Sequence, residues 1–329
     1  MSFCVTINTK KKEMTTSVAM CTYNGEKFLK EQLDSILNQS LPIDEIVICD
    51  DGSTDETIAI IQDYSTANPD KIRLFRNNPA LGVCANFARA ISLCTKDIIF
   101  LADQDDIWKR DKVKTITDYF DAHPSISVVF TNAILIDEKN REFTHLSLFD
   151  VVGINEQMHY FEKGFAMEIF LQENRASGCT MALRKKFVPN VEINEKAELH
   201  TSEQIHDGNI AMSGIVYNAL GCITEPLMYY RQHTSQQYGL MSWIKNPLHL
   251  PSPAKQIGEC NMGYQIFRTH TLLRVEMQKL RHDYIYNTGV LIHAIQYYKV
   301  YGELMWTVMY MDLKRRRNYL KRKLLGRKV

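Results

Sequence analysis

The chain has 329 residues, of which 45% are hydrophobic and 23% are charged, and its formal net charge is +1. This length allows a large core in one domain or two, the composition is ordinary for a globular protein, and the near-neutral charge excludes a general polyanion binder. No apolar stretch is long enough to cross a bilayer, and the segment before Thr16 lacks the apolar core of a signal peptide. The eight cysteines are scattered without a CxxC pair, so we expect a reducing cytosol with neither a disulfide framework nor a zinc site.

The first 140 residues alternate between strand patterns and helix patterns. Short apolar runs predict strands at residues 17–21, 45–50, 71–75, 97–101 and 127–130. Helical spacing of apolar residues predicts helices at residues 26–37, 53–64, 83–93 and 109–120. Ser53-Thr-Asp-Glu56 has the pattern of a capping box at the start of the second helix. This alternation predicts an α/β fold with a doubly wound, mostly parallel sheet.

Polar clusters follow three of the expected strands. Residues 22–25 (Thr-Tyr-Asn-Gly) follow the first strand, residues 50–53 (Asp-Asp-Gly-Ser) the second, and residues 103–106 (Asp-Gln-Asp-Asp) the fourth. Ligands of a doubly wound sheet bind beyond the carboxyl ends of its strands, so we expect the three clusters to line one site. No GxGxxG motif follows the first strand, which argues against a dinucleotide site.

The run from Asp103 to Asp106 carries the strongest chemical signal, because it delivers three carboxylates within four positions. Such close like charges repel each other, and a bound cation is the usual resolution. Oxygen ligands on a loop favour a hard ion such as Mg²⁺ or Mn²⁺, which commonly holds phosphate oxygens. The alternative, a solvated acidic loop that caps the next helix, explains one of these aspartates well and three poorly.

With these clusters in this order, about residues 15–240 resemble a nucleotide-sugar glycosyltransferase of family 2 with the GT-A fold. The motifs are most similar to those of bacterial rhamnosyltransferases that use dTDP-rhamnose to build O-antigen or capsule. The resemblance implies an inverting transfer of a sugar, L-rhamnose in the first instance, onto a hydroxyl of a growing cell-surface polysaccharide. It also implies a GT-A domain over residues 15–245, divided into a nucleotide-binding half (15–140) and an acceptor half (141–245), between an N-terminal extension (1–14) and a helical, basic tail (246–329).

The resemblance assigns the first two clusters to the nucleotide. Asp50 or Asp51 accepts the N3–H of the pyrimidine base, a task that suits an acceptor-only carboxylate. Thr22, Tyr23 and Asn24 line the base and ribose. The alternative is that both clusters are ordinary strand-to-helix turns, with acidic residues that favour the helix N-terminus.

The Asp103–Asp105 pair resembles the DXD motif of this family. By that resemblance Asp105 binds the divalent metal directly, while Asp103 contacts the ribose or a metal-bound water. We expect Asp106 to cap the next helix, with Trp108 packed beneath it; Asp106 as a metal ligand is the alternative.

Residues 229–236 resemble a loop that closes over the diphosphate in related enzymes. His233 completes the metal shell in this interpretation, and Arg231 faces a phosphate or a carboxylate, for which its planar fork is suited. An isolated histidine without a ligand role is an equally good account of His233.

On the acceptor side, His206-Asp207 resembles the acidic motif of this family, which implies that Asp207 is the base that takes the proton of the attacking hydroxyl. A helix N-cap by Asp207 is the structural alternative, and His206 is the alternative base. Gly178, in a segment of small residues, resembles the lining of the acceptor and sugar pocket, although a plain strand with a bulge explains it equally well. Many relatives have a bulky aromatic residue after this aspartate, where the chain has Gly208.

The tail beyond residue 246 combines Tyr, Trp, Leu and Met with a basic cluster at residues 314–317. This composition suits the headgroup region of an anionic inner leaflet, where a lipid-linked glycan acceptor would be found, and it does not suit nucleic acid. We therefore expect a cytoplasmic protein at the cytoplasmic face of the inner membrane; a helical pair packed on the catalytic domain is the alternative.

Three other functions remain open at this point. The donor sugar could be UDP-glucose, UDP-galactose or UDP-GlcNAc, because the motifs do not choose the sugar. A sugar-phosphate nucleotidyltransferase also uses carboxylates, metal and nucleotide, but it usually has a Gly- and Arg-rich loop where this chain has residues 22–25. A catalytically silent nucleotide-binding scaffold would not need the complete set of carboxylates.

Overall fold

The computed structural model describes residues 13–164, 166–172, 174–191, 193, 205–233 and 236. The expected C-terminal helical tail lies outside the described residues, as does nearly all of the N-terminal extension. The strands are β1 (Thr16–Thr22), β2 (Glu45–Asp50), β3 (Ile72–Arg76), β4 (Ile98–Ala102), β5 (Ile107–Trp108), β6 (Val128–Ile136), β7 (Glu142–Ser147), β8 (Met181–Arg184) and β9 (Leu220–Arg231). The α-helices are α1 (Leu29–Leu37), α2 (Thr57–Ala67), α3 (Val83–Leu93), α4 (Lys112–Ala122), α5 (Leu148–Val151), α6 (Ile154–Glu162), α7 (Ala166–Gln172) and α8 (His206–Val216), and two 3₁₀ helices are η1 (Gly178–Thr180) and η2 (Lys185–Asn190).

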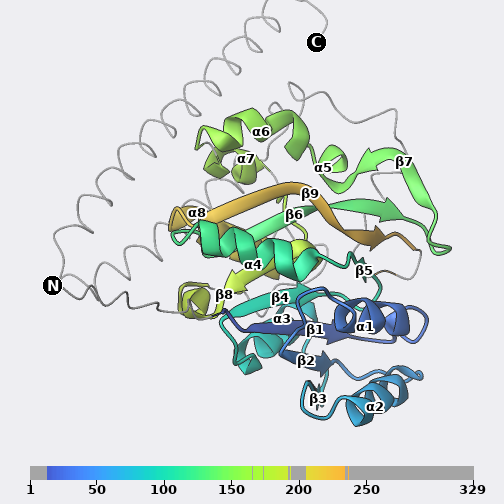
Figure 1. Cartoon of the computed structure of the whole chain (residues 1–329). Helices are drawn as coiled ribbons and strands as arrows, with labels where there is room; N and C mark the ends of the chain where they lie inside the picture. Colours follow the sequence, from blue (N-terminus) through green and yellow to red (C-terminus); the bar gives the residue numbers. More distant parts are fainter. Residues whose placement is uncertain are drawn as a thin grey trace, which may run out of the picture. The chain divides into compact units, whose positions relative to one another are not determined.

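A single nine-stranded sheet organises the described part of the chain, in the order β3-β2-β1-β4-β8-β6-β9-β5 with β7 paired to β6 (Figure 1). β1 is parallel to β2 and β4, and β2 is parallel to β3, so the first half has the expected parallel arrangement. β8 then joins β4 to β6 with antiparallel pairing on both sides. The α/β fold expected from the sequence is confirmed.

The core forms because apolar side chains of the central strands are covered by helices on both faces. Ile46 and Ile48 of β2 lie in one buried cluster with Leu33 of α1 and Ile61 of α2. α3 packs against β1 and β2, and Asn86 of this helix donates to the carbonyl of Cys49 at 2.9 Å. β1, β2 and β3 succeed one another in one direction and β4 returns to the other side of β1, so right-handed crossovers place α3 on the face opposite α1 and α2.

β9 matters most for the site, because its end lies beside the acidic loop that follows β4. β9 runs parallel to β6 and pairs antiparallel with the two-residue strand β5, where Ile107 is opposite Tyr229. Residues 229–231, expected in a loop, therefore belong to a strand, and that strand delivers Arg231 and His233 to the loop formed by residues 103–106.

Two expectations about helix starts are wrong. Ser53 and Glu56 form no capping box: no side chain caps α2, the Ser53 hydroxyl donates to Asp50 instead, and Asp55 accepts the backbone N–H of Thr57. The helix expected from residue 109 begins at Lys112, because the backbone before it continues the pairing with β9. Among the helices of the described part, none combines the length and apolar content that a membrane crossing requires.

Candidate active site

The first two polar clusters meet at the carboxyl ends of β1 and β2. Thr22 is opposite Asp50 in the register, and its hydroxyl donates to Asp50 Oδ2 at 2.9 Å. The Asn24 side-chain oxygen accepts a hydrogen bond from the backbone N–H of Thr54 at 2.9 Å. The backbone N–H of Asn24 donates to the Ser53 hydroxyl at 2.9 Å. Tyr23, between them, leaves 44% of its surface exposed. The two loops therefore form one unit that presents the tyrosine ring to solvent.

Asp50 and Asp51, which the sequence could not separate, have different surroundings. Asp50 is fully buried, and both its oxygens accept internal hydrogen bonds, from Gly52 N, Ser53 N, Ser53 Oγ and Thr22 Oγ1. Asp51 is half-buried and holds the loop before α3, through Asn77 Nδ2 at 2.7 Å, Leu81 N at 2.7 Å and Gly82 N at 2.9 Å. Only Asp51 of this pair has surface available to a ligand.

Hydrogen bonds of Gln104, a residue for which no role was expected, connect the acidic loop to the first cluster. Its Oε1 accepts the N–H of Tyr23 at 2.8 Å, and its Nε2 donates to the Tyr23 carbonyl at 3.0 Å. A Cβ on Gly25 would lie 2.2 Å from this side chain, so only glycine leaves room for the bridge. The position of Gln104 between the two aspartates of the DXD-like motif is the signal that could have identified it.

The carboxylates of separate segments lie within each other's electrostatic influence. Burial raises the pKa of Asp103 to about 7, and the neighbouring charges of Asp105 and Asp207 add to this rise. The thiol of Cys21, at the end of β1, has a pKa raised by burial and further by the charges of Asp103 and Asp51. Asp103 thus lies within the electrostatic influence of Asp207, and Asp51 and Asp103 both act on Cys21 at the end of β1. The strand order predicted the proximity of Asp51 and Asp103 and made no prediction for Asp207.

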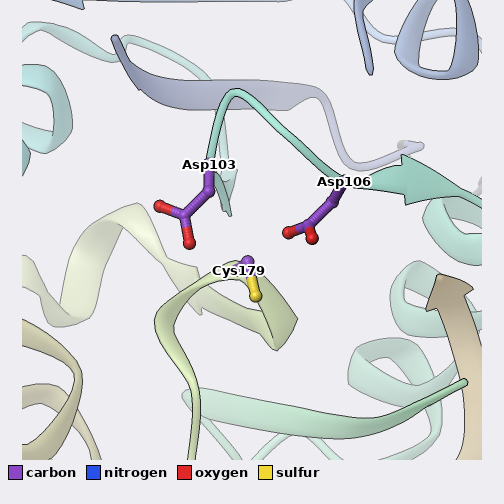
Figure 2. Close-up of side chains that lie close together, drawn as sticks. All are labelled: Asp103, Asp106 and Cys179. Carbon is purple, nitrogen blue, oxygen red and sulfur yellow. The ribbon is translucent and has the colours of Figure 1, made fainter. Parts of the chain in front are cut away.

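Two groups of potential metal-ligating atoms surround the acidic loop. His233 Nε2 lies 2.8 Å from Asp105 Oδ2. Asp103, Asp106 and Cys179 offer ligand atoms within 4.8 Å of one another, and the close-up shows the two aspartates on one loop with Cys179 on the segment next to it (Figure 2). Two buried atoms here, Asp106 Oδ2 and His233 Nδ1, have no hydrogen-bond partner among the described residues. Carboxylate and imidazole donors with spare lone pairs fit a divalent ion.

Asp106 does not cap the following helix, which corrects the expectation. The residue before α4 is Asp111, and no side chain caps that helix. Asp106 is fully buried, its Oδ1 accepts the N–H of Arg231 at 3.0 Å, and burial raises its pKa well above the usual range. Beside it, the buried ammonium of Lys112 donates to the Cys179 carbonyl at 2.8 Å, and burial lowers its pKa to about 8. The lysine supplies positive charge below the acidic loop, a role that sequence spacing did not reveal.

Arg231 meets a carboxylate, one of the two partners expected for it. Its side chain is fully buried, and its Nη2 forms an ion pair with Glu31 of α1 at 2.7 Å. Nε donates to the backbone carbonyl of Asp105 at 2.7 Å, and the guanidinium lies 4.4 Å from the centre of the Phe28 ring. Arg231 thus anchors the acidic loop to α1.

Asp207 lies in the first turn of α8 and is not its N-cap, which is Ile205. Its Oδ1 accepts hydrogen bonds from Asn174 Nδ2 at 2.9 Å and from Gly208 N at 2.6 Å, while Oδ2 accepts the N–H of Gly178 at 3.3 Å. Burial raises the pKa of Asp207 to about 6, and these hydrogen bonds limit the rise. A carboxylate with this pKa is ionised at neutral pH and still basic enough to take a proton.

His206 is buried, and its ring stacks on Phe87 of α3 with the centroids 4.0 Å apart. Burial lowers its pKa to about 3, so the imidazole is neutral at physiological pH. A Cβ on Gly178 would lie 2.6 Å from His206 Nε2, which explains the glycine by close packing. Gly178 begins the 3₁₀ turn η1 ahead of β8, where a plain strand with a bulge was the alternative.

The fold and this group of carboxylates define a glycosyltransferase with a GT-A-like sheet. The model of the family "Glycosyl transferase family 2" matches residues 17–190, and the chain belongs to this family. Among curated relatives, dTDP-rhamnosyl transferase RfbG of Shigella flexneri is 31% identical over 232 residues, covering 67% of this chain and 73% of RfbG. Chondroitin synthase of Escherichia coli is 32% identical over 131 residues, covering 40% of this chain and 19% of the synthase.

Solved structures of TarS from S. aureus have a similar fold. The structure of TarS residues 1–349 in complex with UDP-GlcNAc superposes with a TM-score of 0.51 at 18% identity, covering 68% of this chain and 60% of that chain. The chain thus spans less than two thirds of the TarS fragment. At this identity the comparison establishes the fold.

Proposed function

We propose that this glycosyltransferase inverts the anomeric centre of a pyrimidine nucleotide-sugar, with dTDP-L-rhamnose as the first candidate donor, and transfers the sugar to a hydroxyl of a growing bacterial cell-surface polysaccharide. One observation carries the proposal: a buried carboxylate with a pKa of about 6, Asp207, lies within electrostatic reach of Asp103 on the donor-side loop. The similarity to RfbG, named a dTDP-rhamnosyl transferase, supports the donor, and the UDP-GlcNAc complex of TarS supports a nucleotide-sugar as its class.

On the donor side, Asp51 is the carboxylate assigned to N3–H of the base, because the oxygens of Asp50 are buried in hydrogen bonds within the loop. Tyr23, with its exposed ring, is assigned to stacking on the base or ribose. Thr22 and Asn24 hold the two loops together, and Asp103 is assigned to the ribose.

Asp105 and His233 would hold a divalent ion, Mg²⁺ or Mn²⁺. Their ligand atoms are adjacent, and Asp106 Oδ2 has no hydrogen-bond partner among the described residues. The ion, when bound, neutralises the charge that develops on the leaving diphosphate.

At the acceptor side, Asp207 removes the proton of the acceptor hydroxyl as its oxygen attacks the anomeric carbon. The bond from that carbon to the diphosphate oxygen breaks, and the nucleoside diphosphate leaves from the opposite face of the sugar, which inverts the configuration. His206 is the weaker candidate for the base, because an imidazole with a pKa of about 3 has little affinity for a proton near neutral pH.

A panel of nucleotide-sugars incubated with and without Mn²⁺ tests the proposal, with release of nucleoside diphosphate as the measurement. We expect metal-dependent release, fastest with dTDP-rhamnose, and loss of transfer in Asp207→Asn with donor binding retained. Wild-type turnover in Asp207→Asn would exclude the base assignment. Pyrophosphate release from a nucleoside triphosphate and a sugar phosphate would favour the nucleotidyltransferase alternative.

The cellular placement rests on sequence composition, because the tail beyond residue 246 lies outside the described residues. The aromatic residues and basic cluster of the tail support a peripheral position on the cytoplasmic face of the inner membrane, next to a lipid-linked glycan acceptor. Cosedimentation of the full chain with anionic vesicles, compared with neutral vesicles, tests this placement.

A further inference from the structure

Asn174, which lies outside α8, donates a side-chain hydrogen bond to the expected base, and its own amide orientation is fixed by contacts on both its oxygen and its nitrogen. Asn174 lies just beyond α7, and its Oδ1 accepts the N–H of Ala176 at 3.2 Å. Its Nδ2 donates to the carbonyl of Ala176 at 2.9 Å and to Asp207 Oδ1 at 2.9 Å. Since a carbonyl and a carboxylate only accept, the amide nitrogen must face both, and the amide cannot be flipped without losing these hydrogen bonds.

The two oxygens of Asp207 are unequally used. Oδ1 accepts from Asn174 at 2.9 Å and from Gly208 at 2.6 Å, whereas Oδ2 accepts one longer hydrogen bond, from Gly178 at 3.3 Å. The well-bonded Oδ1 is the oxygen that fixes the carboxylate, and Oδ2 retains a free lone pair for a proton.

We infer that Asn174 is a positioning residue for transfer: it holds Asp207 ionised through Oδ1, so that Oδ2 receives the proton of the acceptor hydroxyl. This inference rests on the proposed function, because it gives the Asn174 contact a catalytic meaning only if Asp207 is the base. Asn174, Gly178 and Gly208 then form a preorganised set of hydrogen-bond donors around Asp207. Each of these donors stabilises the ionised carboxylate of Asp207.

Other groups also act on Asp207 and must be distinguished from Asn174. Among the described residues, the charge of Asp207 raises the pKa of Asp103 in the loop after β4 and of Cys84 in α3. His206 precedes Asp207 on α8. Burial keeps the Cys84 thiol and the His206 imidazole neutral near pH 7. The charge of Asp207 raises the pKa of Asp103, so Asp207 ionises first, and burial is what opposes its ionisation. The hydrogen bonds from Gly208, Gly178 and Asn174 offset that burial.

The test is the titration of Asp207 in the full chain, followed by carbon-13 NMR of its carboxyl group and assigned by the signal missing from Asp207→Asn. Loss of a hydrogen bond to a charged acceptor should raise the pKa of Asp207 in Asn174→Ala by about one unit. The acidic limb of kcat/KM for nucleotide-sugar transfer should move by the same amount, so activity falls about fivefold at pH 6 and hardly at pH 8. A merely structural role would lower activity equally at both pH values.

Two further variants keep the result interpretable. Asn174→Asp keeps the shape and the acceptor for Ala176 N but replaces the donor with a carboxyl. If Asn174→Ala folds poorly, this variant tests whether the side chain faces Asp207, because repulsion between the two carboxylates should then raise the pKa of Asp207 further. Asn155→Ala is the matched control, because it removes an asparagine Nδ2 that donates to a different carboxylate, Asp150 Oδ1, at 2.5 Å. It should leave the pKa of Asp207 and the acidic limb in place.

The outcomes separate this inference from the function on which it rests. An unchanged Asp207 pKa in both Asn174 variants, with Asp207→Asn inactive, overturns the positioning role and leaves the base in place. Full transfer by Asp207→Asn overturns the base, and with it the catalytic meaning of Asn174, whatever the titration shows.

Discussion

Replacing Arg231 with lysine distinguishes a structural anchor from a diphosphate ligand. The arginine is fully buried, and its fork reaches three directions: Nε to the Asp105 carbonyl at 2.7 Å, Nη2 to Glu31 at 2.7 Å, and Nη1 to the Asn140 side chain. The plane of the guanidinium also lies over Phe28. A lysine ammonium keeps the charge but occupies a single point, so it can retain one of these contacts and not all three.

The expected cost follows from the contacts that lysine loses. The ion pair with Glu31 is the contact that a point charge keeps most easily, and it is the least valuable, because the Glu31 side chain is 47% exposed. The hydrogen bonds to the Asp105 carbonyl and to Asn140 are then lost. Hydrogen bonds of a charged group contribute about 1.5–3 kcal/mol each, so Arg231→Lys should lower the free energy of unfolding by about 3 kcal/mol.

Urea unfolding of wild type and Arg231→Lys measures this difference, with calorimetric binding of dTDP and UDP as the second readout. Arg141→Lys is the matched control, because Arg141 pairs with Asp137 through a side chain that is 74% exposed, and its replacement should leave the unfolding midpoint unchanged. If Arg231→Lys unfolds like wild type while nucleotide affinity falls, the anchor interpretation is wrong and the diphosphate role is supported.

Two more predictions follow from neighbouring parts of the site. Asp51→Asn should weaken binding of UDP and dTDP about tenfold, because it removes one charged acceptor. Asp50→Asn should chiefly lower the free energy of unfolding. Equal nucleotide affinity in wild type and Asp51→Asn would contradict the assignment of Asp51 to the base. Gly178→Ala places a Cβ 2.6 Å from Nε2 of His206, whose ring stacks on Phe87, so the free energy of unfolding should fall by about 1–3 kcal/mol. The rate of transfer should fall by about tenfold or more, because the hydrogen bond from Gly178 N to Asp207 shifts. Wild-type melting and turnover of Gly178→Ala would show that the turn can relax.

The strand-end clusters could be predicted because their positions follow from local patterns. The run Glu45–Asp50 is buried along its whole length, as its apolar composition indicated, and its last residue begins the nucleotide-side loop. Parallel pairing of β1 with β2 and β4 then brings the clusters after these strands to one edge, as the topology of doubly wound sheets requires.

Helix starts were less predictable, because tertiary partners override local capping. Ser53 has the residue type of a cap, yet its hydroxyl donates to Asp50 across the loop. Asp106 has the position of a cap, yet it accepts the N–H of Arg231, which is 125 residues away in the chain. The partner of Asp106 cannot be found by reading the neighbouring sequence, since it depends on which strand lies beside the loop, whereas Asp50 lies only three residues before Ser53.

The acceptor side was the least predictable part, because its contacts join segments without a common motif. Asn174 and Asp207 are 33 positions apart, and nothing in the residues around Asn174 marks it as a partner of a base. His233 could be proposed as a neighbour of Asp105 only through the resemblance to a family, since the pairing of β5 with β9 brings them together.

The aspartates of this site differ in hydrogen bonding because their surroundings differ, although their side chains are identical, and their proposed roles follow this difference. Asp50 accepts donors on both oxygens and is buried, so it is part of the loop's structure. Asp207 is also buried, but one oxygen has a single long hydrogen bond, and its pKa of about 6 leaves it able to exchange a proton. Asp103 has a pKa of about 7, so a positively charged partner that lowers this pKa would ionise it fully at neutral pH. Hydrogen bonding, and not burial, therefore separates Asp50 from Asp207, and this difference is what the proposed transfer requires of the two carboxylates.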